Sequence, residues 1–193
     1  MTSLLAMYEV VVATHVAILR AKTPEELYRA VCETIAESGQ FLLCAIVSPN
    51  PVTSRISVDA AAGSASGTLR QALILTDASL VEERGILGEA FRTCEVSVSN
   101  DFLADSRLAS SHTDAKKVGV AAGAAIPLSA DGYPVGVILL YARAKHVFDD
   151  RVIGLLRHTR RSTCLPRHRH PSRATLRFAY LSQHVWQIGR AHV

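Results

Sequence analysis

The chain has 193 residues, 49% hydrophobic and 20% charged, a composition typical of a globular core with room for one domain of ordinary size. The first residues lack the basic start of a targeting segment and are interrupted by Glu9 and His15, so we expect neither a leader nor membrane insertion in this chain. The net charge of +4 is unevenly placed, because all 17 acidic residues lie at or before Asp150 and nine of the 21 basic residues follow it.

Two helices are predicted at the start of the chain. Residues 4–20 place apolar side chains at alternating spacings of three and four, which leaves open a coiled coil and a helix packed on its own domain. A second helix begins after Thr23, because Pro24 suits the first helical position and Glu26 completes a capping box with the threonine. Gly39 ends this helix, since glycine adopts positive φ readily.

Strands follow the second helix. The continuous apolar run from Phe41 to Val47 predicts a central strand that is covered on both faces. Residues 55–62 alternate weakly and predict a second strand, whereas residues 71–75 fit either a strand or the end of a short helix. A short helix is predicted over residues 86–93, where apolar side chains form one stripe that includes Phe91.

The second half of the chain contains one more strand, a long polar stretch and a hairpin. Valines alternate with serines over residues 96–99, which predicts a half-exposed strand. Residues 100–119 are polar and include one or two helical turns. Two apolar runs, 120–128 and 134–142, flank Asp131-Gly132, a strong hairpin signal, and a helix starts near residue 149.

The order of these elements predicts the fold class. Helices and strands are mixed without strict βαβ alternation, which favours an α+β fold in which helices pack against an antiparallel sheet. No internal repeat is visible.

Several ordered segments of the chain resemble GAF domains. "TPEELYRAVCETIAESGQF" resembles the opening helix of such a domain, and "ERGILGEAFRT" and "DGYPVGVILLYARAKHVFDDRVIGLL" resemble its second half. The resemblance covers roughly residues 5–157 and is closest to the GAF sensors of bacterial signalling proteins, often upstream of GGDEF-type diguanylate cyclases or histidine kinases. It implies an antiparallel sheet flanked by helices, with a small-molecule pocket on one side.

The resemblance implies sensing without catalysis. A GAF domain binds a small ligand or pairs with itself and biases its neighbours through its terminal helices, here residues 4–20 and the helix near residue 149. We expect an unidentified small-molecule ligand, a homodimer through these helices, and no nucleic-acid partner. The sequence contains no GxSxG, P-loop, GxGxxG or HExxH motif, so we expect no enzyme activity, cofactor or metal.

The expected ligand-binding residues lie in and around the polar stretch: Phe91, Asn100, Asp101, Phe102, Asp105, Ser111 and His112. Asn100 and Asp101 have a competing interpretation as a local Asx-turn. Cyclic-nucleotide-binding GAF domains carry a lysine where this chain has Asp101, which puts that ligand in doubt. Bilin-binding GAF domains carry a cysteine where this chain has Ser111, so a covalent bilin is not expected.

Other polar residues of the stretch have both functional and purely structural interpretations. His112 either hydrogen-bonds a ligand, serves as a lone haem ligand, or is solvated. Asp105 and Arg107 are expected to form an exposed ion pair of little energetic weight. Lys116 and Lys117 either attract an anionic ligand or form a solvated helix face.

The four cysteines are Cys32, Cys44, Cys94 and Cys164, and they form no Cys-x-x-Cys pair. This pattern is typical of cytoplasmic thiols, and Cys32 and Cys44 fall on elements that suit them to packing. The alternative functions are a GAF-fold redox enzyme of the free methionine sulfoxide reductase type that uses Cys94, and a pure dimerisation module. The reductase chemistry needs a second thiol in reach.

Residues 158–193 differ in character from the preceding domain. Pro166 and Pro171 prevent a continuous helix, and the resemblance has ended. The last six residues, 188–193, resemble the translation of a sequencing adapter, so we expect residues 158–193 to be a basic tail that is disordered or non-native, translated out of frame. The parent would then be a longer signalling protein.

Two other interpretations of the tail are less favoured. Cys164, His168 and His170 do not follow zinc-finger spacing and lack a fourth ligand. The arginines suit phosphate contacts, but a basic composition is also what such a shifted frame produces.

Overall fold

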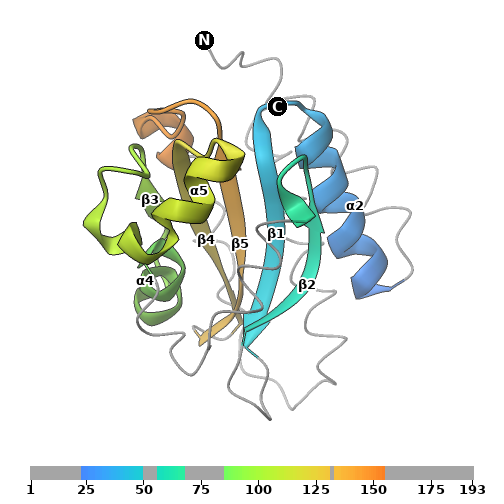
Figure 1. Cartoon of the computed structure of the whole chain (residues 1–193). Helices are drawn as coiled ribbons and strands as arrows, with labels where there is room; N and C mark the ends of the chain where they lie inside the picture. The colour runs from blue at the N-terminus through green and yellow to red at the C-terminus, as the bar shows by residue number, and fades with distance from the viewer. Residues whose placement is uncertain (1–22, 50–55, 68–84, 131–132, 155–193) are drawn as a thin grey trace.

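The computed structural model describes residues 23–49, 56–67, 85–130 and 133–154. Its core is a five-stranded sheet in the order β2-β1-β5-β4-β3, in which every neighbouring pair is antiparallel (Figure 1). The strands are β1 (Phe41–Pro49), β2 (Ile56–Ala62), β3 (Ser97–Ser99), β4 (Ala122–Ala130) and β5 (Tyr133–Ala142). The expected α+β fold is confirmed. The predicted helix over 4–20, the segment 71–75 and the tail 158–193 lie outside the described residues.

Helix α2 (Pro24–Glu37) forms for the local reasons that the sequence indicates. The Thr23 hydroxyl accepts a hydrogen bond from the Glu26 backbone N–H at 3.2 Å, which satisfies one of the free donors of the first turn. Gly39 follows the helix at φ 73°, a conformation that side chains with a Cβ rarely adopt. Figure 1 shows α2 beside β1 and β2.

The sheet separates two apolar layers, and the period of two along each strand decides which residues enter which layer. On one face, α2 packs against β1 and β2, and its Leu27 and Val31 join the apolar layer on that side. On the other face, helix α4 (Gly85–Thr93) packs Ile86 and Phe91 against β4 and β5. The predicted apolar stripe of α4 and the prediction that β1 is covered on both faces are both confirmed.

The polar stretch folds over the α4 face of the sheet. It contains a 3₁₀ helix, η1 (Ser106–Ser111), and the short helix α5 (His112–Val118), as the sequence indicates. Leu108 and Ala115 attach these turns to the core beneath them. Gly119 ends α5 at φ 78°, and the Phe102 N–H donates to the Ala121 carbonyl at 2.8 Å, which fixes the start of the segment.

Strand β3 corrects one expectation. The alternation of valine and serine is present, but the strand is not half-exposed, because both serines are buried. Val96 and Val98 pack into the α2-side layer, and Ser97 and Ser99 alternate with them toward α4. The alternation of valine and serine had suggested solvent on the serine face, whereas α4 and Arg107 of η1 cover that face.

The predicted hairpin and last helix are present. Strands β4 and β5 pair up to Ala130 and Tyr133, which leaves only residues 131–132 between them. Asp149 caps the last described helix, since its carboxylate accepts from the Val152 N–H at 2.8 Å and its carbonyl from the Ile153 N–H.

Candidate functional site

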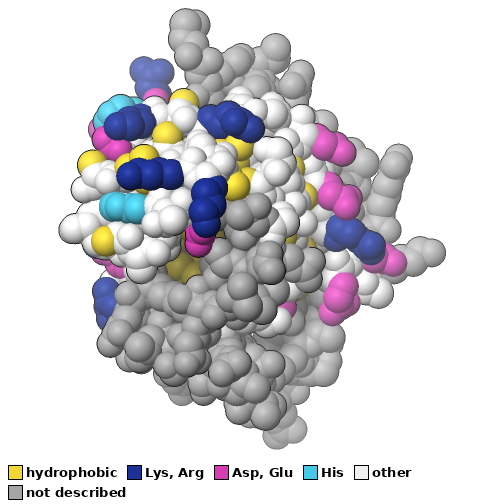
Figure 2. Space-filling model, in the orientation of Figure 1, with side chains coloured by type: hydrophobic (Ala, Val, Ile, Leu, Met, Phe, Trp, Pro, Cys, Tyr) yellow, Lys and Arg dark blue, Asp and Glu magenta, His cyan; other side chains and the backbone are white. Residues whose placement is uncertain are grey.

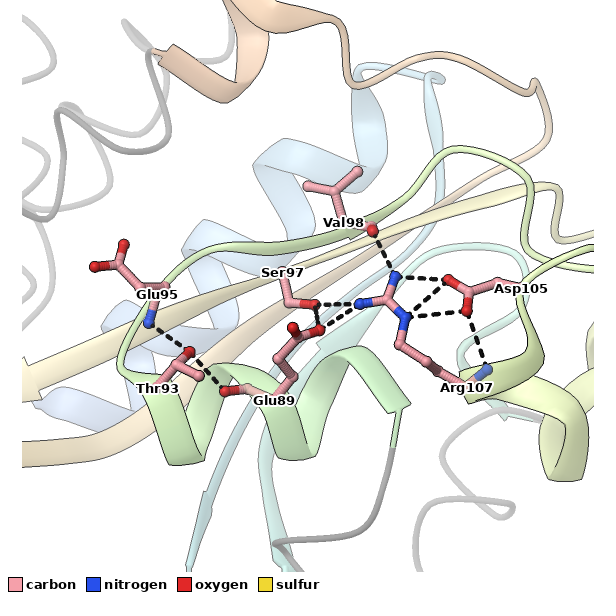
Figure 3. Close-up of polar contacts among 7 residues, drawn as sticks. All are labelled: Glu89, Thr93, Glu95, Ser97, Val98, Asp105 and Arg107. Carbon is pink, nitrogen blue, oxygen red and sulfur yellow. Dashed lines mark hydrogen bonds and ion pairs between the residues drawn. The ribbon is translucent and has the colours of Figure 1, made fainter.

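A polar cluster joins α4, β3 and η1, and Arg107 lies at its centre (Figure 3). Its guanidinium binds the carboxylates of Glu89 and Asp105, the latter with Nη2 at 2.7 Å from Oδ2. Ser97 Oγ donates to Glu89 Oε2 at 2.6 Å, so α4 is tied to the strand as well. The expected Asp105–Arg107 pair is therefore present, as part of a larger network.

Arg107 also covers the edge of the described sheet. Its Nη2 donates to the Val98 carbonyl at 2.9 Å, a group that would otherwise face a further strand (Figure 3). Because β3 is the edge strand of the described sheet, this contact gives a hydrogen-bond donor to a backbone carbonyl that has no neighbouring strand there. The arginine thus fixes the border of the candidate site and blocks strand addition there.

The electrostatics of the cluster favour an ionised Asp105. Its carboxylate accepts from the Arg107 guanidinium and from the Arg107 backbone N–H at 3.1 Å, and these contacts lower its pKa to about 2. The Ser99 hydroxyl lies near this carboxylate and also favours its charged form, although the hydroxyl lacks the geometry of a hydrogen bond. Asp105 is therefore an anion at any pH near neutrality.

Two buried polar atoms near the cluster have no hydrogen-bond partner among the described residues. They are Ser99 Oγ, on a residue only 3% exposed, and Asp101 Oδ1. The other oxygen of Asp101 binds Lys145 Nζ at 2.7 Å, a contact that lowers the pKa of the carboxyl group. Buried polar atoms without partners are rare because each costs free energy, so these two atoms are candidates for contact with a ligand, although the Ala104 backbone N–H also lies close enough to lower the pKa of Asp101.

Phe102 and Tyr141 form an aromatic pair in the α4-side layer, which we term the aromatic floor. Phe102 is buried and meets Tyr141 edge to face, with ring centroids 5.3 Å apart. His112 lies on its other side at 6.5 Å, and its Nε2 is 3.1 Å from the Asp105 carbonyl oxygen. Burial raises the pKa of the Tyr141 hydroxyl far above its ordinary value, so the group stays neutral.

The Tyr141 ring occupies space that a glycine leaves open. Gly123 is its cross-strand partner on β4, and a Cβ at that position would lie 2.9 Å from the ring and 3.1 Å from Ile86. The ring therefore lies flat against the backbone of the neighbouring strand.

The Asn100 side chain forms two hydrogen bonds with the backbone of Phe148, which the sequence around Asn100 does not indicate. Its Nδ2 donates to the Phe148 carbonyl at 2.8 Å, and its Oδ1 accepts from the Phe148 N–H at 3.1 Å. The His146 N–H also donates to the Asn100 carbonyl. The side chain thus clamps a segment 48 residues away, and the local Asx-turn does not describe it.

The remaining expected site residues are divided between the core and the surface. Phe91 is buried in the same apolar layer as Phe102. Ser111 is exposed at the start of α5, where its side chain makes no capping hydrogen bond. The structure therefore brings Phe91, Phe102, Asp105 and His112 to the α4 face.

Positive charge gathers above this face. Figure 2 shows several Lys and Arg side chains over the region of α5. Lys116 and Lys117 lie in the last turn of α5, and Lys117 pairs with Asp114 at 2.8 Å. Two of the basic groups, Lys117 and Lys145, are thus already partnered by carboxylates, which leaves a mildly positive, solvated surface.

The cysteines lie apart from the aromatic floor. Cys32 and Cys44 are buried in the α2-side layer, on the opposite face of the sheet from α4. Cys94 follows α4 at φ 54° and is partly exposed. The described residues therefore offer no second thiol on the α4 face to resolve an oxidised Cys94.

Within the described ranges, no group of three or more His, Cys, Asp or Glu side chains could hold a metal ion. None of the helices in those ranges has the length and apolar character needed to cross a membrane.

Sequence reasoning missed four contributors to this site. Glu89 and Ser97 are ordinary surface types at their positions, and Ser99 had been placed on an exposed face. Tyr141 was counted as one residue of an apolar strand. For Tyr141, the glycine at position 123 is a signal, because a glycine within a strand often marks a close approach of a neighbouring group.

Solved structures with the same arrangement are diverse in function. The GAF domain region of a putative membrane protein from Geobacter sulfurreducens is 19% identical, with a TM-score of 0.57 over 71% of this chain and 87% of that chain. Free methionine-R-sulfoxide reductase from Neisseria meningitidis, in complex with its substrate, is 14% identical, with a TM-score of 0.63 over 99% and 95%. The GAF domain from an Acinetobacter phosphoenolpyruvate-protein phosphotransferase is 12% identical, with a TM-score of 0.60 over 98% of each chain.

Identities this low show a shared fold and leave the activity open. No curated protein matches the chain. A family model described as GAF domain matches residues 21–159, which is most of the chain and includes every described element. The match and the observed sheet agree with the resemblance in the sequence, and the chain belongs to the GAF domain family.

Proposed function

We propose that this GAF domain is a small-molecule-sensing regulatory module of a bacterial, cytoplasmic signalling protein, without catalysis of its own. The ligand would bind on the α4 face, against Phe102 and His112. The observation that carries this proposal is that two buried atoms, Ser99 Oγ and Asp101 Oδ1, lack a hydrogen-bond partner among the described residues. A polar ligand that bonds them would recover the free energy that the unliganded fold loses.

The output of the proposed sensor is mechanical. The segment over residues 100–118 contacts the α4 face through Leu108 and also holds the start of the last helix through Asn100. A ligand that binds the two arrangements of this segment unequally would shift the position of the last helix. In the parent protein that helix would lead to an output domain of the diguanylate cyclase or histidine kinase type, and the terminal helices would pair two copies.

The reductase alternative has less support. It requires two thiols in reach of each other at the ligand site, and the buried pair lies on the other face of the sheet. Turnover of free methionine sulfoxide by the full chain that is lost in Cys94→Ser would overturn this preference.

Thermal denaturation of the full chain against a panel of amino acids, methionine sulfoxide, cyclic nucleotides and other small polar metabolites tests the proposal. We expect one class of compound to raise the melting temperature of the wild-type chain. Ser99→Ala should melt at the same temperature as the wild type or higher without ligand, and should lose most of the ligand-induced shift.

Ser97→Ala is the matched control, because it is the other buried serine of β3 but has a partner. It should melt lower than the wild type and keep the ligand-induced shift. If Ser99→Ala instead melts several degrees lower, Ser99 donates to Asp105 and is not available to a ligand. If no compound in the panel changes the melting temperature, a pure dimerisation module becomes the better interpretation.

A further inference from the structure

The α2-side layer contains two thiols in contact. Cys32 on α2 and Cys44 on β1 are both fully buried, and their sulfur atoms lie 3.7 Å apart. A disulfide bond needs about 2.05 Å between the sulfurs, so the two sulfur atoms must come closer by about 1.7 Å for the bond to form.

We propose that Cys32 and Cys44 are an oxidation site, at which hydrogen peroxide or a low-molecular-weight disulfide converts the thiol pair into a bond between α2 and β1. The bond would join helix α2 to strand β1, which lies between β2 and β5 in the sheet. It lies on the face opposite the proposed ligand site, so the inference does not depend on that proposal.

The chemistry of the peroxide reaction balances within the pair. The Cys32 sulfur attacks the peroxide, the O–O bond breaks, and a sulfenic acid and one water form. The Cys44 sulfur then attacks the sulfenic sulfur, the S–S bond forms as the S–O bond breaks, and a second water leaves. Two electrons pass from the sulfurs to the peroxide, and both thiol protons end in water.

The positions of the two residues assign these roles. Cys44 is held in the middle of the sheet, paired with Ala62 on β2 and with Leu140 on β5, and it cannot move without breaking strand pairing. Cys32 lies on α2, which contacts the sheet through one face and can separate from it locally. The neighbouring Cys32 sulfur and burial raise the pKa of Cys44, which disfavours a first attack by this thiol.

The bond would change the mechanics of the domain. It would close a loop over the 11 residues between the cysteines, which reduces the freedom of the unfolded chain. It would also prevent α2 from moving relative to β1. Oxidation would therefore fix one end of the domain while leaving the α4 face unaltered.

The test uses the full chain with Cys94→Ser and Cys164→Ser, so that only the buried pair remains. The folded protein is equilibrated in buffers of reduced and oxidised glutathione, quenched in acid, unfolded and labelled with a maleimide. A parallel set is equilibrated in concentrated guanidinium chloride. An equilibrium readout does not depend on how often α2 opens.

Mass spectrometry locates the bond. Both cysteines fall in one tryptic peptide, residues 30–55, because no lysine or arginine lies between them. The disulfide would make this peptide two hydrogens lighter, and cleavage after Glu33 and Glu37 would convert it into two linked fragments. The wild-type chain, mapped in the same way, shows whether Cys94 or Cys164 competes.

We expect the folded chain to stabilise the disulfide at least about tenfold over the unfolded chain, because folding holds the two sulfurs in contact. The oxidised protein should also melt roughly 5–10 °C higher than the reduced protein. Cys32→Ala and Cys44→Ala should each abolish both effects. Equal stability of the bond in the folded and unfolded chains, or oxidation that gives sulfinic acids without a linked peptide, would overturn the proposal.

Discussion

The two faces of the sheet are built from the same strands but differ in the side chains that cover them. The α2 face is filled by apolar side chains, among them Phe148 and the sulfur pair. The α4 face has a similar apolar base but adds an ion-pair network, and the polar segment beside it has two buried polar atoms without partners among the described residues. One face therefore supplies stability and the other gives up part of it, an arrangement typical of proteins with a binding site.

The strands supply this difference through small residues. On β4, Ala122 and Ala124 face α2, and Gly123 and Ala125 face α4. The absence of a side chain at Gly123 gives room to a ring from the next strand. Changes that affect one face and not the other test whether the two faces are as independent as this packing indicates.

The largest effect is expected from Phe102→Ala, which removes a fully buried ring from the α4 face. The loss of its apolar contacts should lower the free energy of unfolding by about 3–5 kcal/mol. Urea denaturation, monitored by far-UV circular dichroism, measures this change in the free energy of unfolding. Leu103→Ala is the control, because Leu103 follows Phe102 directly but is 36% exposed. This variant should change the free energy of unfolding by less than about 0.5 kcal/mol. Similar losses in both variants would contradict the described burial.

Gly123→Ala tests the close approach of the Tyr141 ring. The added Cβ would overlap this ring and Ile86, so we expect a loss of about 1–3 kcal/mol. Combining it with Tyr141→Leu should give a coupling energy of at least about 0.5 kcal/mol in urea denaturation. Strictly additive losses would show that the ring and the glycine do not meet.

Asn100→Ala tests the clamp that connects the polar stretch to the last helix. Two hydrogen bonds to the Phe148 backbone would be lost, at a cost of roughly 1–2 kcal/mol. Amide hydrogen exchange should increase at Phe148 and at the capped turn that follows. Asn100→Asp keeps an acceptor for the Phe148 N–H and should show part of the loss. Unchanged exchange in both variants would mean that the clamp does not hold this segment.

The smallest effect is the pH dependence from Asp105. Its pKa of about 2 in the folded protein lies below the ordinary value of about 3.9, so its contribution is present above about pH 4 and is lost as the pH falls toward 2. After allowance for solvent screening we expect about 1 kcal/mol. The difference in free energy of unfolding between the wild type and Asp105→Asn should shrink over that range and in high salt. A constant difference would assign the stabilisation to another group.

The elements of this fold could be predicted from the sequence because their causes are local. Thr23 caps α2, Gly39 ends it, and residues 131–132 allow only a tight connection between two apolar runs. The alternation of valine and serine on β3 could also be predicted from the sequence. The sequence did not indicate which face of β3 would be covered, because α4 and Arg107 reach this strand from other parts of the chain.

What the sequence alone determined, then, is the family and the order of the helices and strands that the structure describes. The tertiary structure decided which side chains meet. Glu89, Ser97 and Arg107 converge only because α4 and η1 fold over the edge strand. Cys32 and Cys44 come into contact only because α2 folds back on β1. Periodicity and capping depend on near neighbours in sequence, whereas these contacts depend on how whole elements pack against one sheet.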